Sequence, residues 1–201
     1  FSCKEFASLQ YKDLPFYKII IFWSFFSKIY YGFEKSNKRI HGDELKVSFN
    51  SPDAFEELIW KNNLNNYLSS GFFKKLDTEY VNIKLQNELD DLIKKTLYVK
   101  KKKRYLSKNN YNIFRLKYLI KQYNDANFII LFRDPIETII SLDKVHKKFI
   151  DLGKNDKNFG EELEILGHHE FGPKRKAFNI SNNFEKTIYY WDRGIDHNGY
   201  L

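Results

Sequence analysis

The stretch that decides the fold is residues 103–142, KRYLSKNNYNIFRLKYLIKQYNDANFIILFRDPIETIISL. Residues 104–108 have the character of a short strand, and apolar side chains at helical spacing follow over residues 111–123. A turn at residues 124–125 leads into residues 127–132, NFIILF, a continuous apolar run that is typical of a strand buried on both faces. The order strand, helix, strand, helix predicts a right-handed parallel crossover and therefore an α/β fold.

A helix start follows the second predicted strand, with Asp134 as its N-cap and Pro135 at the first helical position. The free N–H groups and the dipole at such a helix start favour an anion. Lys108 and Arg133 each come directly after a predicted strand, at the sheet edge where parallel sheets bind ligands. Ser141 lies two turns into the helix and can add a hydroxyl. This pattern predicts a site for a phosphate or sulfate group.

Composition limits the class of protein. The chain has 201 residues, of which 42% are hydrophobic and 30% charged, so it can form a single domain with a core that needs no disulfide. The mean hydropathy is −0.59, and the most apolar stretch, residues 17–31, is interrupted by lysines and lacks a cleavage site. We therefore expect neither a transmembrane segment nor a signal peptide. Cys3 stands alone, which excludes a disulfide framework and a cysteine zinc site.

The net charge of +8 favours anionic partners but does not choose among polyanions, phosphate-bearing cofactors, acidic glycans and lipid head groups. The basic run at residues 100–104, KKKKR, is interpreted first as a solvated approach to a strand, then as a contact for an acidic acceptor. A specific nucleic-acid patch is the weaker interpretation. His168 and His169 are adjacent and have no evident third ligand, so we expect no metal site.

Two further helices are predicted upstream of the central stretch. One follows Ser51 as N-cap and Pro52 at the first helical position. The other covers about residues 78–97, where apolar side chains recur at helical spacing. The first of these helices and the aromatic residues 22–31 are expected, from their position, to shape the side that receives an acceptor.

The central stretch resembles the signature of sulfotransferases that use 3′-phosphoadenosine 5′-phosphosulfate (PAPS). In that family a strand ends in a lysine, a helix follows, and the next strand leads into Arg-Asp-Pro with a serine eight residues after the arginine. Lys108, Arg133 and Ser141 have this order and spacing. The resemblance implies the P-loop NTPase-like fold, a three-layer sandwich with a central parallel sheet.

The same resemblance implies an enzyme that moves a sulfuryl group from PAPS to a hydroxyl or amine of a carbohydrate, lipid or small molecule, without a metal. Arg133 and Ser141 would bind the 3′-phosphate. Lys108 would lie near the sulfuryl group or its bridging oxygen and offset charge during transfer. A base must take the acceptor proton, and the candidates are Glu5 and His41, with Asp13 as a third.

The chain departs from the family at its start, where the phosphosulfate-binding loop rich in Gly, Ser and Thr is missing. It contains no methionine and no Walker motif. We therefore expect a single sulfotransferase-like domain over residues 1–201 that is truncated at both ends and incomplete at the N-terminus. Low stability and weak donor binding are expected, and activity of these residues alone is left open. The compartment would be the cytoplasm for a bacterial protein and otherwise the secretory-pathway lumen; the oligomeric state is not indicated.

Two alternatives stay open. A nucleoside or small-molecule kinase would share the parallel sheet but requires a Walker loop and magnesium. A basic polyanion-binding module would bind any polyanion with a steep dependence on salt and without preference for 3′-phosphorylated adenine nucleotides. The spacing of Arg133 and Ser141 favours the sulfotransferase.

Overall fold

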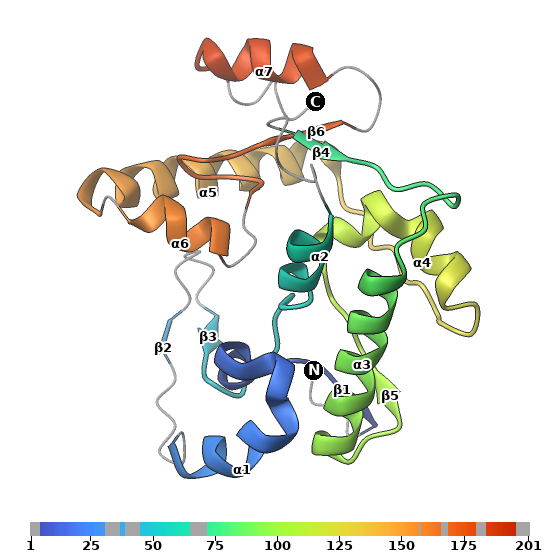
Figure 1. Cartoon of the computed structure of the whole chain (residues 1–201). Helices are drawn as coiled ribbons and strands as arrows, with labels where there is room; N and C mark the ends of the chain where they lie inside the picture. Colours follow the sequence, from blue (N-terminus) through green and yellow to red (C-terminus); the bar gives the residue numbers. More distant parts are fainter. Residues whose placement is uncertain are drawn as a thin grey trace. The chain divides into compact units, whose positions relative to one another are not determined.

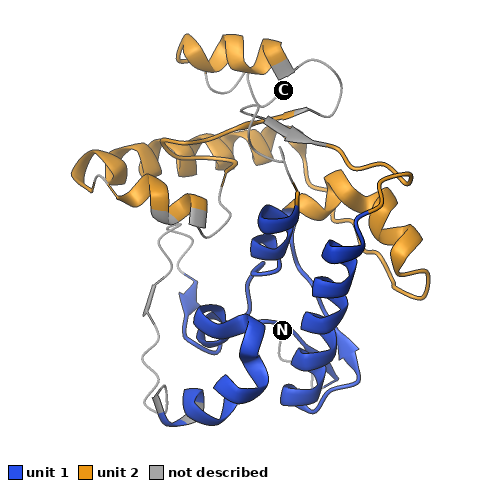
Figure 2. Cartoon of the chain, in the orientation of Figure 1, with its two compact units in different colours: residues 1–63, 82–110 blue, residues 64–81, 111–201 orange. Residues whose placement is uncertain are grey.

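The computed structural model describes residues 5–30, 37–38, 45–64, 72–156, 158–165, 169–179 and 184–195. The chain divides into two compact units (Figures 1 and 2). Unit 1 consists of residues 1–63 and 82–110, and unit 2 of residues 64–81 and 111–201. Each unit buries apolar side chains of its own. The prediction of one sulfotransferase-like domain over residues 1–201 stays a prediction.

Unit 1 is mainly helical. Its elements are β1 (Phe6–Ala7), the 3₁₀ helix η1 (Tyr11–Ile19), α1 (Ile20–Tyr30), β2 (Asn37–Lys38), β3 (Lys46–Val47), α2 (Glu57–Asn63), α3 (Ile83–Lys100) and β5 (Arg104–Tyr105). β1 pairs in parallel with β5, with Ala7 opposite Tyr105. β2 pairs antiparallel with β3. The strand predicted at residues 104–108 is thus present in shorter form.

Helix α3 is the central element of unit 1 and contacts α1, α2, β1 and β5. Asn82 caps its start by accepting a hydrogen bond from the backbone N–H of Leu85 at 2.9 Å, as an N-cap asparagine does. Leu85, Leu89 and Leu92 are buried because their spacing places them on one helix face. Lys101 ends the helix in the left-handed conformation, with φ of 53°. The helix predicted over residues 78–97 is confirmed, and it begins and ends later, at residues 83 and 100.

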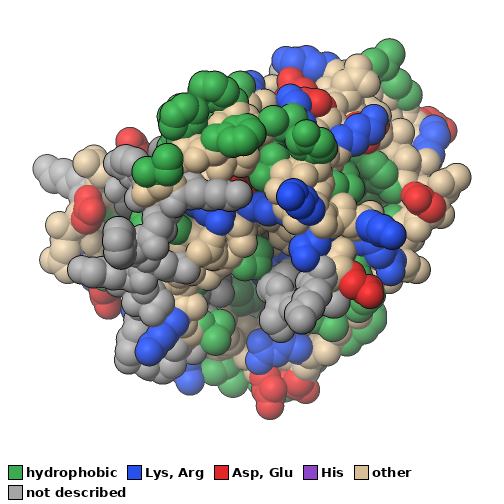
Figure 3. Space-filling view, turned by 90° about the horizontal axis from the view of Figure 1, so that it is seen from below, with side chains coloured by type: hydrophobic (Ala, Val, Ile, Leu, Met, Phe, Trp, Pro, Cys, Tyr) green, Lys and Arg blue, Asp and Glu red, His purple; other side chains and the backbone are tan. Residues whose placement is uncertain are grey.

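Helix α1 has apolar side chains on two faces. Ile20 is fully buried, whereas Phe22, Phe25, Phe26 and Ile29 are exposed. Figure 3 shows hydrophobic side chains gathered together on one face of the molecule, seen from the end at which Figure 1 shows α1. Among the described residues, no helix is both long and apolar enough to cross a membrane.

Unit 2 contains β4 (Phe72–Lys74), η2 (Asn110–Arg115, which begins at the boundary), α4 (Leu116–Gln122), α5 (Pro135–Asn155), α6 (Phe159–Ile165), β6 (Ala177–Asn179) and α7 (Phe184–Asp192). β4 pairs in parallel with β6. A core cluster is formed by Phe149, Phe159, Leu163 and Phe171. The ring of Phe149 meets two of these aromatic rings edge to face, an arrangement that aromatic pairs prefer.

Residues 127–132 differ from the prediction. They form no strand, and Leu131 and Phe132 are 87% and 91% exposed, so the buried strand predicted there is wrong for this structure. An apolar run becomes a buried strand only where a neighbouring strand supplies hydrogen bonds and other layers cover its faces. Within the described part of the chain no strand pairs with this run. The sheets among the described residues have two strands each, so the three-layer sandwich with a central parallel sheet is not tested by them and stays a prediction.

The predicted helix after Ser51 also begins later, at Glu57. Pro52 instead forms an isolated bridge with Gln10, and Asp53 accepts a hydrogen bond from the Tyr11 hydroxyl at 2.8 Å. Pro52 and Asp53 are thus engaged in long-range contacts and do not form the first turn of the helix.

Asp13 and Lys100 form a buried ion pair that joins η1 to the end of α3. The Lys100 ammonium lies 2.7 Å from Asp13 Oδ2, and their side chains are 17% and 3% exposed. The same carboxylate accepts a hydrogen bond from the backbone N–H of Gln10 at 3.0 Å. Burial lowers the pKa of Lys100, while the charge of Asp13 acts in the opposite direction. Removing one partner would leave the other charge buried without compensation.

Replacing Asp13 with alanine is expected to lower the free energy of unfolding by about 3 kcal/mol, because Lys100 loses its buried counter-charge. Urea unfolding followed by circular dichroism measures this change. Asp91→Ala is the matched control, since Asp91 pairs with Lys95 on the more exposed surface of α3, where such pairs contribute about 0.3–0.5 kcal/mol. Equal losses in the two variants would contradict a structural role for the buried pair.

Candidate functional site

Lys108 lies in the segment that follows the carboxyl end of β5, and its side chain is exposed. The backbone of this segment is attached to the residues of β1 and those just after it. The N–H of Leu106 donates to the carbonyl of Ala7 at 2.8 Å, and the Ser8 hydroxyl donates to the carbonyl of Leu106 at 2.6 Å. Lys108 thus extends from a backbone that two long-range hydrogen bonds hold in place.

Two acidic side chains from the start of α2 support the same segment. Glu56 and Glu57 are only 5% and 4% exposed. Glu56 accepts a hydrogen bond from the Tyr105 hydroxyl, and Glu57 accepts one from the side-chain amide of Asn109 at 2.8 Å. These partners lie on either side of Lys108 in the sequence. The segment is therefore held before and after the lysine.

A pocket of about 220 Å³ lies in unit 1 beside β1. Its polar lining includes Ser8, Gln10, Asn50, Lys100 and Lys102. Several of these groups bond to one another or to nearby residues; the Gln10 amide, for example, donates to the carbonyl of Asn50 at 2.6 Å. The pocket is therefore a small polar hollow in which structural hydrogen bonds already use much of the lining.

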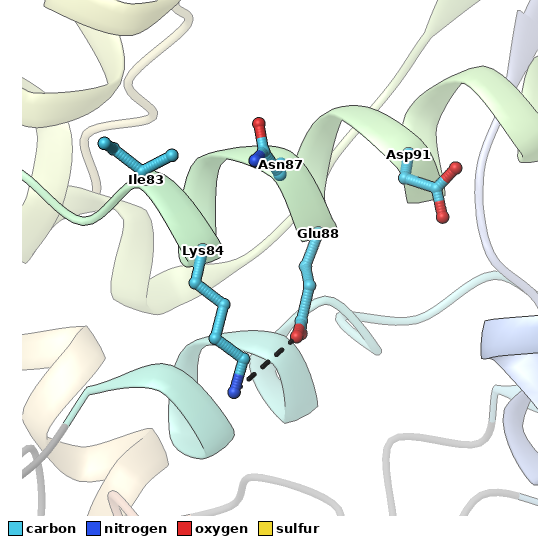
Figure 4. Close-up of a pocket in the computed structure, with 5 residues that line it drawn as sticks. All are labelled: Ile83, Lys84, Asn87, Glu88 and Asp91. Carbon is cyan, nitrogen blue, oxygen red and sulfur yellow. Dashed lines mark ion pairs between the residues drawn. The ribbon is translucent and has the colours of Figure 1, made fainter.

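A wider hollow of about 600 Å³ is lined by residues of α3 alone, among them Ile83, Asn87 and Asp91 (Figure 4). Within it Lys84 and Glu88 form an ion pair at 4.0 Å, with the lysine side chain 73% exposed. Because one helix face lines this hollow and it is widely open, it does not bring together groups from different elements. We do not consider it the candidate site.

In unit 2, the start of α5 matches the predicted helix start. Asp134 accepts a hydrogen bond from the backbone N–H of Glu137 at 2.9 Å, and proline follows at the first helical position. The Thr138 hydroxyl donates to the carbonyl of Asp134 at 2.8 Å. Arg133, directly before the cap, and Ser141, within the helix, are both exposed. The predicted N-cap is thus confirmed.

The predicted site residues fall into separate parts of the chain. Lys108 belongs to unit 1, and Arg133 and Ser141 belong to unit 2. Their roles toward a nucleotide donor stay predictions. Among the residues described, no group of three or more His, Cys, Asp or Glu could hold a metal ion.

The candidates for the acceptor base have different surroundings. Glu5 is exposed in unit 1, and His41 lies outside the described residues. Asp13 is buried against Lys100 and bonded to the Gln10 backbone. A base must reach the proton that it abstracts, so the surroundings of Asp13 suit a structural carboxylate.

Glu56 and Glu57 were not among the site residues predicted from the sequence. A signal for Glu56 was available, because Glu56, Ile59, Trp60 and Asn63 have the spacing of one helix face and all four are buried. An acidic residue aligned with the apolar residues of a helix indicates a buried and hydrogen-bonded carboxylate.

Tyr105 has an unusual proton affinity in the folded chain. Burial first, and the nearby Glu56 carboxylate second, raise the pKa of Tyr105 well above its ordinary value. The folded state therefore keeps the phenolic proton at a pH where the unfolded state has lost it. The resulting stabilisation is complete below about pH 10, the unfolded pKa, and is lost as the pH rises further.

We therefore expect the stability of the wild-type chain to fall more steeply between about pH 9 and 11 than that of Tyr105→Phe, by up to about 1.4 kcal/mol per pH unit. Urea unfolding at a series of pH values measures both slopes. The contribution of Lys100, whose lowered pKa makes stability rise with pH in the alkaline range, is common to both proteins. Parallel pH profiles would show that Tyr105 is not buried against the carboxylate.

No protein-family model matches the chain, and neither a curated protein nor a solved structure shows significant similarity to it.

Proposed function

We propose that the chain belongs to a PAPS-dependent sulfotransferase, in which it binds the 3′-phosphate of the donor and provides a cation at the sulfuryl group. The observation that supports this most directly is the start of α5. Arg133 is exposed directly before a capped helix terminus, and Ser141 is exposed six residues after the first helical residue. An exposed arginine, the N-terminal end of a helix and a hydroxyl are groups that favour an oxyanion.

The residues present fit a donor of this kind. Arg133 offers a planar array of N–H groups that matches phosphate oxygens, and Ser141 offers one further hydroxyl donor. Lys108 adds a compact positive charge on a flexible stem. Lys108 and Arg133 take part in none of the ion pairs found within the described residues, so neither charge is already neutralised by a carboxylate there.

The donor supplies an activated sulfuryl group whose bond to the bridging oxygen breaks as the bond to the acceptor oxygen or nitrogen forms, leaving 3′-phosphoadenosine 5′-phosphate (PAP). Lys108 would offset the negative charge that collects on the bridging oxygen, because a cation placed where charge develops lowers the barrier. The acceptor proton must pass to a base, for which Glu5 and His41 stay the candidates. The acceptor class proposed is a carbohydrate, lipid or small molecule with a hydroxyl or amine.

Calorimetric titration of the full-length protein with PAP and with adenosine monophosphate tests the proposal. We expect PAP to bind at least about 10-fold more tightly, since a charge-assisted contact to the 3′-phosphate contributes about 1.5–3 kcal/mol. Arg133→Ala should abolish this preference and leave monophosphate binding unchanged. Lys148→Ala is the matched control, because Lys148 is an exposed cation on the same helix.

Equal binding of the two nucleotides by a folded wild-type protein would contradict the proposal. A preference for ATP that requires magnesium would instead support the kinase. Salt-sensitive binding of any polyanion, unaffected by Arg133→Ala, would support the polyanion-binding module.

Ser141→Ala is expected to weaken PAP binding by a smaller factor, about 2- to 10-fold, because a neutral hydroxyl donor contributes about 0.5–1.5 kcal/mol. Binding of adenosine monophosphate, which lacks the 3′-phosphate, should stay the same. Ser141→Thr keeps the hydroxyl and should retain most of the PAP affinity. A loss of affinity for both nucleotides would mean that Ser141 acts on helix stability and not on the 3′-phosphate.

A further inference from the structure

We propose that Glu57, assisted by Glu56, is a positioning residue that fixes the segment carrying Lys108. What Lys108 does there rests on the proposed function; how the segment is held does not. Neither glutamate is proposed to bind the donor or to act as the base. They act through Asn109 and Tyr105, the residues to which they are hydrogen-bonded.

The contacts join parts of the chain that are far apart in sequence. Glu57 and Asn109 are separated by 52 positions and are joined by a 2.8 Å hydrogen bond. Glu56 and Tyr105 are separated by 49 positions. Leu106 also donates its N–H to the carbonyl of Ala7 and accepts from the Ser8 hydroxyl, so the segment is attached to two other parts of unit 1. Lys108 lies between these attachments and is exposed, as is Ser107 beside it.

The burial of the two carboxylates supports a specific role for them. A carboxylate withdrawn from water is tolerated only where hydrogen bonds or counter-charges compensate for the lost hydration. At 4% exposure, Glu57 depends on its protein partners, and Asn109 is one of them. Because a bond to a buried charge is stronger than one between neutral groups, the carboxylate holds the Asn109 side chain more firmly than an exposed residue would.

A fixed backbone matters for a lysine more than for a shorter side chain. Lysine has four rotatable side-chain bonds, and a displaced Cα moves the whole range that its ammonium can reach. Reaction rates are sensitive to such displacements, so a change of about 1 Å far from the reacting atoms can cost about 100-fold. We therefore expect Glu57 to affect interactions made by the Lys108 ammonium and to leave those of Arg133 unchanged.

The test compares the binding of PAP and of adenosine 3′-monophosphate to the full-length protein. The two differ by the 5′-phosphate, which carries the oxygen that bridges to the sulfuryl group in PAPS, so the ratio of their dissociation constants reports the contact of Lys108 with that oxygen. Lys108→Ala is expected to reduce the affinity for PAP at least about 10-fold relative to adenosine 3′-monophosphate, since a hydrogen bond to a charged group contributes about 1.5–3 kcal/mol. Glu57→Ala should reproduce most of this change, with the affinity for adenosine 3′-monophosphate within about 2-fold of wild type. The double variant should lose no more than Lys108→Ala alone, since residues that act as a unit are not additive.

Two further variants separate positioning from loss of structure. Glu57→Gln keeps a side-chain oxygen that can accept from Asn109 but loses the charge, so it should change the ratio less than Glu57→Ala does. Glu88→Ala is the matched control: Glu88 accepts from the amide of Asn63 at 2.9 Å within the same unit, but neither residue lies in the Lys108 segment. A change of the ratio of the two dissociation constants in Glu88→Ala equal to that in Glu57→Ala would overturn the proposal, as would an additive double variant.

Amide hydrogen exchange gives a measurement that is independent of the donor. Exchange of the Leu106 amide, whose N–H donates to the carbonyl of Ala7, should be at least about 10-fold faster in Glu57→Ala than in wild type, because local opening is controlled by local bonds. It should rise less in Glu57→Gln, which keeps the acceptor oxygen without the charge, and should be unchanged in Glu88→Ala. Wild-type protein that binds neither nucleotide would contradict the proposed function alone, whereas unchanged exchange in Glu57→Ala would overturn the positioning role alone.

Discussion

Unit 1 depends on three carboxylates that are almost entirely withdrawn from water and must each be compensated by the protein. The carboxylates belong to Asp13, Glu56 and Glu57. Each of them has a partner in one stretch of ten residues, and these partners are Lys100, Tyr105 and Asn109. Hydrophobic burial by the leucines of α3 supplies compaction, but it is not directional. The carboxylates decide where residues 100–109 lie against η1 and α2.

This arrangement changes the interpretation of the basic run at residues 100–104. Lys100 is buried in its ion pair, Lys101 ends α3 in the left-handed conformation, and the Arg104 guanidinium lies 5.2 Å from the centre of the Phe6 ring. Part of the run is therefore structural and is not a uniform solvated patch. The positive charge that stays available to a ligand in this part of the chain is smaller than the sequence suggests. Lys108 contributes to it from an exposed position.

The sequence predicted those features that local chemistry controls. The Asp134 cap, the proline at the first position of α5 and the leucine face of α3 follow from residues close together in the chain, and the structure has all of them. The helix after Ser51 was predicted too early, because Pro52 and Asp53 contact residues some 40 positions away. Pattern-based prediction does not include such contacts.

The same distinction between local and long-range interactions explains why the prediction was wrong for residues 127–132 and missed the burial of Glu56 and Glu57. Residues 127–132 have a strong intrinsic preference for a buried strand, yet burial depends on neighbouring strands and layers, which the described residues do not supply for them. Conversely, pattern analysis treats acidic residues as exposed, so Glu56 and Glu57 were assigned no role. Of the candidate site, the Asp134 cap beside Arg133 could be predicted, but not the hydrogen bonds that support the segment of Lys108.

The support of Lys108 bears on how a flexible side chain can take part in chemistry. Ordering a lysine costs about 2 kcal/mol of rotamer entropy, and each backbone residue ordered in the same step would add about 1–2 kcal/mol. In unit 1 the hydrogen bonds of Tyr105, Leu106 and Asn109 order the backbone during folding. Only the side-chain cost is then left for the step in which an anion is bound. A lysine at this position can therefore combine a wide reach with a fixed origin, which a lysine on an unattached loop cannot.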